Sequence, residues 1–317
     1  MWLWASRRGE GVEAITSVVT ASLVGFFARL YMLRTDYRQY PSYPQGYVIH
    51  LSLGLIASFL GAVAVPALLV KDYAAATFLA LAATQFREVR KTERETLSNL
   101  EPMELIPRGN GYIEGIARVF EARNYLAGGT ALFTSIVVLI LSQYWSLPIA
   151  IFGGVVGGAI LVWLLDGMMI GPKVGDLANV RGAEIRFTGP LLMVEDIVIM
   201  NVGLETARQR LLKEGIGVLI EPRDPNSKAT LANLGQRQAI LHDATSLLGV
   251  EMDVGEPEYI PLLRRHPVTG ALAMAIIPGE KNTVALLEAV RRTPILEASV
   301  RKPLASQAGR LADRHRE

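Results

Sequence analysis

Long apolar stretches alternate with charged stretches along this chain, and the alternation predicts where it meets a membrane. Residues 12–86 and 126–170 carry few charged side chains, whereas 87–125 and 173–317 carry most of them. A helix needs roughly 20 apolar residues to cross the hydrocarbon core of a bilayer. Stretches of that length lie at Val12–Leu33, Val48–Val70, Leu126–Tyr144 and Pro148–Ile170. The pattern therefore predicts a multi-pass membrane protein.

The segment Tyr73–Phe86 leaves the number of spans open between four and five. It is apolar, but only about two-thirds as long as a bilayer-spanning helix. As an interfacial helix it gives four spans and an N-terminus inside the cell. As a short fifth span it places the N-terminus outside. Short alanine-rich spans are tolerated inside a bundle, and this favours five.

The distribution of lysine and arginine predicts the orientation in the membrane. Four basic side chains lie between Arg87 and Arg94, and Arg118 and Arg123 precede the third long stretch, whereas residues 143–147 contain none. Cytoplasmic loops of membrane proteins carry an excess of Lys and Arg. We therefore expect residues 87–125, and everything after 172, on the cytoplasmic side of the membrane.

After Lys173 the pattern changes to short strands alternating with helices, which is typical of an α/β domain. Strands are expected at Ile197–Asn201, Val218–Glu221, Glu258–Leu263, Ala271–Ile277 and Ile295–Val300, and helices at Leu204–Glu214, Lys228–Leu248 and Lys281–Arg292. The expected fold is a membrane α-helical bundle of four or five spans followed by a cytosolic α/β domain. The expected domains are a transmembrane domain at 1–172 with a cytosolic loop at 87–125, an α/β domain at 173–302 and a flexible tail at 303–317.

Composition excludes several kinds of chemistry. A formal net charge of +2 gives no reason to invoke nucleic acid. The absence of cysteine excludes disulfides and thiolate sites. The four histidines lack the spacing of metal ligands, and Gly215-Ile216-Gly217 lacks the third glycine of a dinucleotide-binding loop. We therefore expect no cofactor, no metal and no enzymatic activity.

Two overlapping pairs of small residues, Gly153 with Gly157 and Gly154 with Gly158, lie in the last apolar stretch. Glycines at this spacing let two membrane helices approach closely. The contact is either within one chain or between protomers of an oligomer.

Charged residues within the apolar stretches are candidates for a polar path, since they are rare in membranes and usually functional. The two main candidates are Arg29 and Asp166, and Glu13 and the uncharged polar residue Gln85 are further candidates. All four lie near the ends of stretches, so ordinary placement at the membrane interface also explains them.

The segment Gly109–Gly129 predicts an amphipathic helix, because Ile113, Ile116, Ala117 and Phe120 recur at helical spacing. Glu114 and Arg118 are four residues apart and are expected to pair on another face. Such a helix is either an elbow that leads into the next span or a docking element that rests on the membrane surface or on another subunit. Gly115 inside it indicates a close packing neighbour.

The hexapeptide Tyr112-Ile113-Glu114-Gly115-Ile116-Ala117 is identical to the one that names the YIEGIA family of bacterial membrane proteins. The order of apolar stretches before a soluble domain is also similar to that family. The resemblance implies a protein of endospore-forming bacteria with no assigned enzymatic activity and a small capping-type partner subunit. We therefore expect a homo-oligomeric subunit of a membrane complex, in the cell or forespore membrane, with channel formation and a role in sporulation as further expectations.

Two other functions stay open at this point. A transporter or permease component would use the polar residues near the span ends. A membrane-tethered sensor would bind a small ligand in its α/β domain.

Overall fold

The computed structural model describes residues 2–36, 44–69, 73–86, 88–104, 106–169, 171–253, 256–257 and 259–314. The chain divides into two compact units. The helical unit contains Met1–Glu93 and Ile116–Ile170, and the α/β unit contains Arg94–Gly115 and Gly171–Glu317. Residues 87–125 were expected in the first domain, whereas residues 94–115 belong to the α/β unit. The side chains of Gln85 and Asp166 lie outside the described part.

The helical unit is built from α1 (Trp2–Asp36), α2 (Pro44–Leu69), α3 (Tyr73–Phe86), most of α5 (Asn110–Ser142) and α6 (Leu147–Met169). Within the described residues, four helices are long and apolar enough to cross a membrane: Gly11–Arg34 in α1, Gly46–Leu69 in α2, α5, and Leu147–Leu165 in α6. These correspond to the four stretches expected from hydropathy. The short helix α3 has 14 residues and is not among them.

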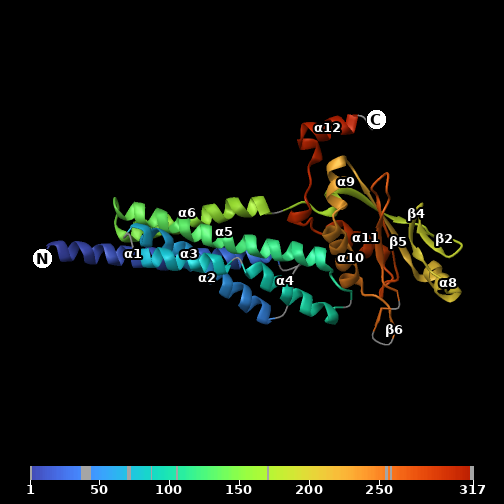
Figure 1. The fold of residues 1–317 in the computed structure, drawn as a ribbon, viewed down its shortest axis with the longest axis horizontal. Helices are drawn as coiled ribbons and strands as arrows, with labels where there is room; N and C mark the ends of the chain where they lie inside the picture. Colours follow the sequence, from blue (N-terminus) through green and yellow to red (C-terminus); the bar gives the residue numbers. More distant parts are fainter. Residues whose placement is uncertain are drawn as a thin grey trace. The chain divides into compact units, whose positions relative to one another are not determined.

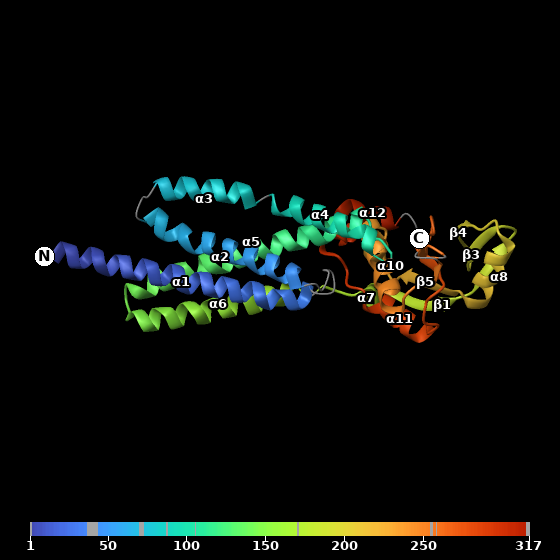
Figure 2. The same cartoon turned by 90° about the horizontal axis from the view of Figure 1, so that it is seen from below.

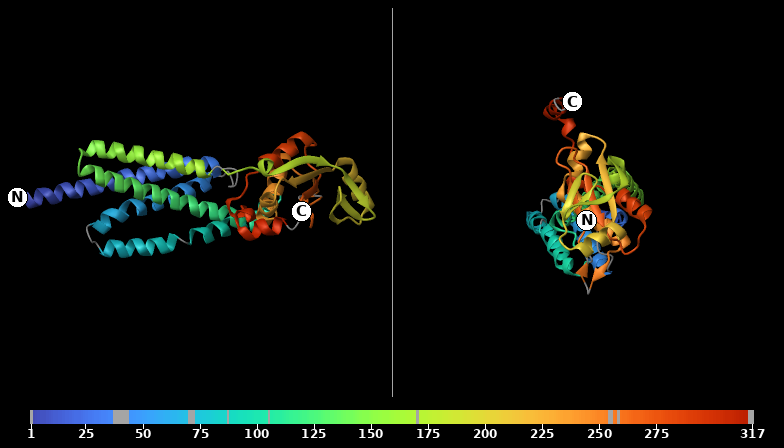
Figure 3. Two further views of the ribbon diagram at one scale, coloured as in Figure 1. Left: turned by 90° about the horizontal axis from the view of Figure 1, so that it is seen from above. Right: turned by 90° about the vertical axis from the view of Figure 1, so that its right-hand side faces the viewer.

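The helices α1, α2, α3, α5 and α6 alternate in direction along the bundle (Figure 2). The short α3 lies beside α2 and returns the chain toward the end where α2 began. As a result, the start of α1 lies at the same end of the bundle as the turn between α5 and α6 (Figure 3, left). The four-or-five ambiguity therefore rests on whether the 14-residue α3 counts as a crossing.

The amphipathic segment 109–129 is not a separate interfacial helix. It forms the first half of α5, which runs without interruption for 33 residues. No proline interrupts it, and its two adjacent glycines are tolerated because a neighbouring helix covers one of them. Of the two interpretations of this segment, the structure agrees with the one in which the helix continues directly into a long apolar helix.

Three glycines that the sequence analysis did not single out bring the helices α1, α2 and α5 together. A Cβ atom on Gly61 would lie 2.1 Å from the carbonyl oxygen of Gly128. A Cβ atom on Gly25 would lie 2.8 Å from the carbonyl oxygen of Ala127 and 2.6 Å from Oγ of Ser58. Backbones this close leave no room for a side chain, so these glycines fix where the helices cross.

Within its described residues the α/β unit contains nine strands and several short helices, some of which are labelled in Figure 1. Its strands are β1 (Ala178–Ala183), β2 (Ile185–Thr188), β3 (Leu191–Val194), β4 (Ile197–Asn201), β5 (Ile216–Pro222), β6 (Met252–Asp253), β7 (Glu256–Pro257), β8 (Leu262–Arg265) and β9 (Leu272–Ile276). Its helices include α7 (Val174–Leu177), α8 (Glu205–Glu214), α9 (Pro225–Leu231), α10 (Leu234–Leu248), α11 (Thr283–Arg292) and α12 (Gln307–Arg314), while α4 (Val89–Leu100) begins in the helical unit.

A four-stranded antiparallel sheet in the order β1-β5-β9-β8 forms the centre of this unit. Strand β9 shows how it is packed, because its side chains alternate between two cores. Leu272, Met274 and Ile276 join the core under α10 and α11. Ala273 and Ala275 join the core under α8 and the antiparallel meander β2-β3-β4.

The structure corrects two of the expected elements. The expected helix Lys228–Leu248 is divided, because the Asn233 side chain accepts a hydrogen bond from the backbone N–H of Gln236 and begins α10. The expected strand Ile295–Val300 is wrong, since Glu297–Ser299 is a short 3₁₀ helix. The side-chain oxygen of Gln236 accepts the backbone N–H of Leu296 at 2.7 Å, a bond that a neighbouring strand would otherwise supply.

Strands β1, β2, β3, β6 and β7 were not predicted. Charged or glycine residues interrupt the apolar runs of β1 and β2, and β3, β6 and β7 are only two to four residues long. The other expected strands and helices are found near their predicted positions, with β8 shifted toward Arg265. The segment expected to be a flexible tail contains η3 (Pro303–Ala305) and α12.

Candidate functional site

The first four residues of the family hexapeptide lie in the α/β unit, packed against α10. The backbone N–H of Tyr112 donates a hydrogen bond to Oε1 of Gln238 at 3.1 Å. The Tyr112 ring packs edge-on against the His242 ring, with 5.8 Å between centroids. A Cβ atom on Gly111 would lie 2.9 Å from the backbone nitrogen of Gly235, so these two chain segments touch through their backbones.

The segment just before the hexapeptide is held by a buried cation. The Arg108 guanidinium lies 2.6 Å from the carboxylate of Glu104 and 3.7 Å from that of Glu101. The Glu101 carboxylate also accepts the backbone N–H groups of Arg108 and Gly109, at 3.0 and 2.8 Å. Charge-assisted bonds of this kind fix the turn that starts α5.

His242 is buried within the α/β unit. Its Nδ1–H donates to the carbonyl oxygen of Ile106 at 3.2 Å, and its Nε2 faces Oγ of Ser246 at 3.3 Å. Burial lowers the pKa of His242, and the nearby Arg108 charge lowers it further. The imidazole is therefore neutral at pH 7 and serves as a fixed structural partner of Tyr112.

The docking face expected on this helix is already covered within the chain. Ile113, Ile116 and Phe120 are all 1% exposed or less, so no apolar strip is left for a membrane surface or another subunit. Ala117 is equally buried. The close neighbour expected at Gly115 is Leu296 of the same chain, whose Cδ1 would lie 3.1 Å from an added Cβ. In the single chain the expected apolar strip is therefore not exposed.

Glu114 has an ion-pair partner on α4. Its carboxylate lies 4.0 Å from the guanidinium of Arg94, and both side chains are partly exposed. Exposed pairs of this kind contribute at most about 1 kcal/mol. The charged residue of the hexapeptide thus has a modest structural role in the single chain.

Arg29 is fully buried inside the helical unit, not placed at the interface as its position near a span end suggested. Its Nε–H donates to Oδ1 of Asn124 on α5 at 3.2 Å. Its guanidinium lies 5.4 Å from the centroid of the Phe120 ring, and His50 packs edge-on against the same ring at 4.4 Å. A Cβ atom on Gly54 would meet the Arg29 side chain at 2.4 Å, so a glycine makes room for it.

Glu93 on α4 supplies negative charge to this buried cluster. Its carboxyl is 7% exposed and interacts electrostatically with Arg29. Burial raises the pKa of Glu93 to about 7, although the Arg29 charge acts in the opposite direction. A group with this pKa changes its charge near neutral pH. The cluster thus joins α1, α2, α4 and α5 through groups that sequence spacing does not bring together.

The four glycines of α6 pack within the chain. An added Cβ would lie 2.4 Å from Leu141 at Gly153, 2.3 Å from Val138 at Gly154 and 2.5 Å from Val24 at Gly158. At Gly157 the nearest atom belongs to Phe133, at 3.5 Å. The glycines therefore seat α6 against α5 and α1, so a contact between protomers is no longer needed to explain them.

A polar pocket of about 450 Å³ lies on the α/β unit. The Arg181 guanidinium sits in it, 2.9 Å from the carboxylate of Glu195 and 3.4 Å from that of Glu221. Glu195 has a φ of 52°, which is uncommon for a residue with a side chain. Arg186, Asp196 and Thr269 line the same pocket. Because its lining carries both positive and negative charges, the pocket suits a small polar molecule. The unusual backbone conformation in this lining is that of Glu195.

Three arginines gather on another surface of the α/β unit without a described counter-charge. Arg237 on α10 lies near Arg264 and Arg265 on β8, and its Nε is buried with no hydrogen-bond partner. Burial lowers the pKa of Arg237, and the charges of Arg265 and Arg264 lower it further. Among the described residues no carboxylate forms an ion pair with these three side chains. We call them the arginine cluster.

The sequence-based candidates for a polar path through the membrane do not assemble in the described part of the chain. Arg29 is enclosed, and the Asp166 side chain lies outside the described residues. Glu13 lies elsewhere, 3.4 Å from Oγ of Ser142. Within the described ranges no group of three His, Asp or Glu side chains is placed to hold a metal ion.

Comparison with known proteins shows a family and a relative. A profile of the family described as YIEGIA protein matches residues 17–306. The chain is 43% identical over 291 residues to the uncharacterized protein YphB of Bacillus subtilis (strain 168), which covers 92% of this chain and 95% of that protein. No solved structure matches the chain.

Proposed function

The chain belongs to the YIEGIA family, and from that membership we propose that it is a non-enzymatic subunit of a bacterial membrane complex. Four apolar helices embed it in the cell membrane, with the α/β unit on the cytoplasmic side. The α/β unit binds a small acidic partner subunit of the capping type. Homo-oligomerisation, channel formation and a role in sporulation, including placement in the forespore membrane, belong to the same proposal.

The arginine cluster is the observation that supports partner binding. Three like charges placed together destabilise the free chain, and a buried Nε without a partner adds to that cost. Carboxylates of a partner would supply both the missing charge and the missing hydrogen-bond acceptor. Arg264 also has a structural role, since its Nε–H donates to the carbonyl oxygen of Ile199 at 3.0 Å, so Arg237 and Arg265 carry the proposal.

The test is binding of the small partner to the purified full-length chain at increasing salt. Arg237→Glu combined with Arg265→Glu should weaken binding by about tenfold or more, because repulsion replaces attraction. Arg292→Glu is the matched control, since Arg292 lies on α11 and already pairs with Glu288. Unchanged binding in the double variant, or an equal loss in the control, would reject the cluster as the binding surface.

Topology can be tested because the chain has no cysteine of its own. Single cysteines at Ser98, Ser146 and Ser306 occupy exposed positions, unlike the buried Ser227. An impermeant reagent added to intact cells should label position 146 alone. Labelling at 98 or 306 without labelling at 146 would reverse the proposed orientation.

A small-ligand sensor is the second candidate function, and the polar pocket around Arg181 favours it. A ligand in this pocket should raise the melting temperature of the full-length chain, and Arg181→Gln should abolish that shift. A transporter would instead show flux in proteoliposomes that is lost in Arg29→Gln. Particle images of the purified protein would reveal a ring if the chain forms a channel.

A further inference from the structure

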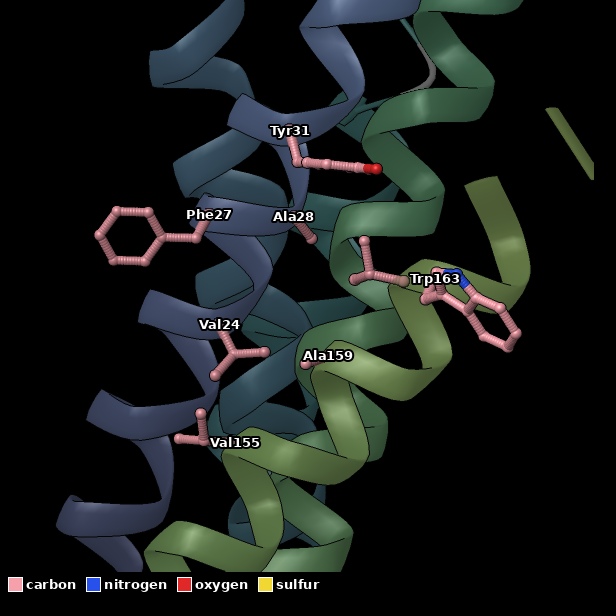
Figure 4. A pocket seen from close by; sticks show the side chains of 8 residues that line it. Val24, Phe27, Ala28, Tyr31, Val155, Ala159 and Trp163 are labelled. Carbon is pink, nitrogen blue, oxygen red and sulfur yellow. The ribbon is translucent and has the colours of Figure 1, made fainter. Parts of the chain in front are cut away.

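An apolar groove of about 440 Å³ runs between α1 and α6 on the surface of the helical unit (Figure 4). Its size falls in the range of roughly 300–1,000 Å³ that is usual for small-ligand sites. It is lined by Val24, Phe27, Ala28 and Tyr31 from α1 and by Val155, Ala159, Val162 and Trp163 from α6. None of these side chains is charged.

The groove arises from the way the two helices meet. At Gly158 the helices touch, because an added Cβ would lie 2.5 Å from Val24. Beside this contact the floor is made of small residues, Ala28 and Ala159, while larger side chains stand at the rim. In Figure 4 Phe27 points away from α6 and Trp163 projects outward, so neither fills the space between the helices.

A cation lies at one end of the groove. Arg34 follows Tyr31 by one helical turn, and its guanidinium lies 5.4 Å from the centroid of the Tyr31 ring. Arg34 is exposed, and within the described residues no carboxylate forms an ion pair with it. Tyr31 and Trp163 are of the type that lies at the level of lipid headgroups. Apolar lining, an aromatic rim and a terminal cation therefore follow one another along the groove.

We propose that this groove binds one acyl chain of an anionic phospholipid whose phosphate is held by Arg34. The inference rests on the proposed membrane location of the helical unit. A flexible hydrocarbon chain fits an apolar groove without fixed polar groups, and the cation selects a negatively charged headgroup. A helix from a second copy fits less well, because close helix packing needs small residues at the rim. Here the rim is bulky, and the glycines of α6 are already used within the chain.

The experiment measures lipid retention by the full-length protein in detergent, using native mass spectrometry with phosphatidylglycerol or phosphatidylcholine added. The wild type should retain one phosphatidylglycerol in preference to phosphatidylcholine. Arg34→Gln should weaken phosphatidylglycerol binding about fivefold, with little effect on phosphatidylcholine. Arg34→Lys keeps the charge and should bind nearly as the wild type does.

A second variant tests the groove independently of the charge. Ala159→Leu fills the floor at an exposed position and should weaken binding of both lipids, whereas Val156→Leu on the same helix, outside the groove, should not. Unchanged phosphatidylglycerol retention in Arg34→Gln or in Ala159→Leu would overturn the proposal. Efficient disulfide dimers of Ala159→Cys would also overturn it, because a second copy would then occupy the groove. The outcome is separate from partner binding, which depends on the α/β unit.

Discussion

In the helical unit the fully buried Arg29 interacts with the buried carboxyl of Glu93, whereas in the α/β unit the buried Arg108 lies near an imidazole, that of His242, which is kept neutral. Asn124, the Phe120 ring and Glu93 surround the Arg29 side chain. His242 stays uncharged because burial disfavours its charged form and the nearby Arg108 charge disfavours it further. The two units also pack differently, since glycines set the helix crossings whereas alternating aliphatic side chains fill the two cores of the sheet.

This difference gives the two units separate responses to mutation and to pH, and the sequence supplies a way to observe them. All four tryptophans, Trp2, Trp4, Trp145 and Trp163, lie within residues 1–170. Tryptophan fluorescence therefore reports on the helical unit. Hydrogen exchange of amides in β5 and β9 reports on the α/β unit.

The largest expected effect is at the crossing of α2 and α5. Gly61→Leu should destabilise the helical unit by more than about 3 kcal/mol, because its side chain would displace the backbone of Gly128. Thermal unfolding followed by tryptophan fluorescence measures the loss. Gly129→Leu is the control, since nothing lies within 4 Å of a Cβ there. Equal destabilisation by the two changes would show that the contact of Gly61 with Gly128 does not fix the helix crossing.

The next effect concerns the buried charge. Arg29→Met should cost about 3–5 kcal/mol, because it leaves Glu93 without its cation. Adding Glu93→Gln should recover part of that loss. In the α/β unit Arg108→Met should cost less, since Glu104 is more accessible to water. Additive losses for the Arg29 and Glu93 changes would mean that the two groups do not interact.

The pH responses should have opposite signs in the two units. The pKa of Glu93 rises from 4.5 to about 7 in the folded chain, a shift worth roughly 3 kcal/mol. This stabilisation is complete below pH 4.5 and is lost as the pH rises through 7. The pKa of His242 is lowered from 6.5, so its contribution is present above pH 6.5 and is lost on acidification.

Melts at pH 5 and pH 8 test this contrast. Tryptophan fluorescence should show a less stable helical unit at pH 8, and Glu93→Gln should flatten that dependence. Hydrogen exchange should show a looser α/β unit at pH 5, with the dependence reduced in His242→Gln. A shared sign in both units would contradict the assignment of the two groups.

The smallest expected effects lie in the hexapeptide region. Gly115→Ala should change the stability of the α/β unit by no more than about 1 kcal/mol, because its near neighbour is the mobile end of Leu296 and alanine favours the helix. Gly111→Ala should cost more, since it meets the backbone of Gly235. Hydrogen exchange across α10 distinguishes them. A larger loss of stability for Gly115→Ala than for Gly111→Ala would show that the contact with Leu296 is tighter than the one with Gly235.

The sequence predicted what depends on local pattern and missed what depends on distant neighbours. Hydropathy located the four long apolar helices because a span is defined by its own residues. Arg29 was misplaced because its burial depends on Asn124, which lies 95 residues away. Ile295–Val300 was taken for a strand because its apolar residues gave no sign that Gln236 would bind its backbone. The arginine cluster was missed because Arg237 is far in sequence from β8.

The α/β unit is discontinuous in sequence, and this bears on how the chain is made. Its segment Arg94–Gly115 ends in the first turns of α5 and is synthesised before the rest of α5 and before α6, and the residues it packs against come only afterwards. Tyr112 has to wait until Gln238 is synthesised before their hydrogen bond forms, and Gly115 has to wait until Leu296 is synthesised before the two can touch. At a synthesis rate of about 5–20 residues per second, the second wait lasts roughly 10–40 s. During that interval Ile106 and Tyr112 are apolar surfaces without their final cover, so a chaperone or an early-bound partner would act most effectively while the ribosome is still attached.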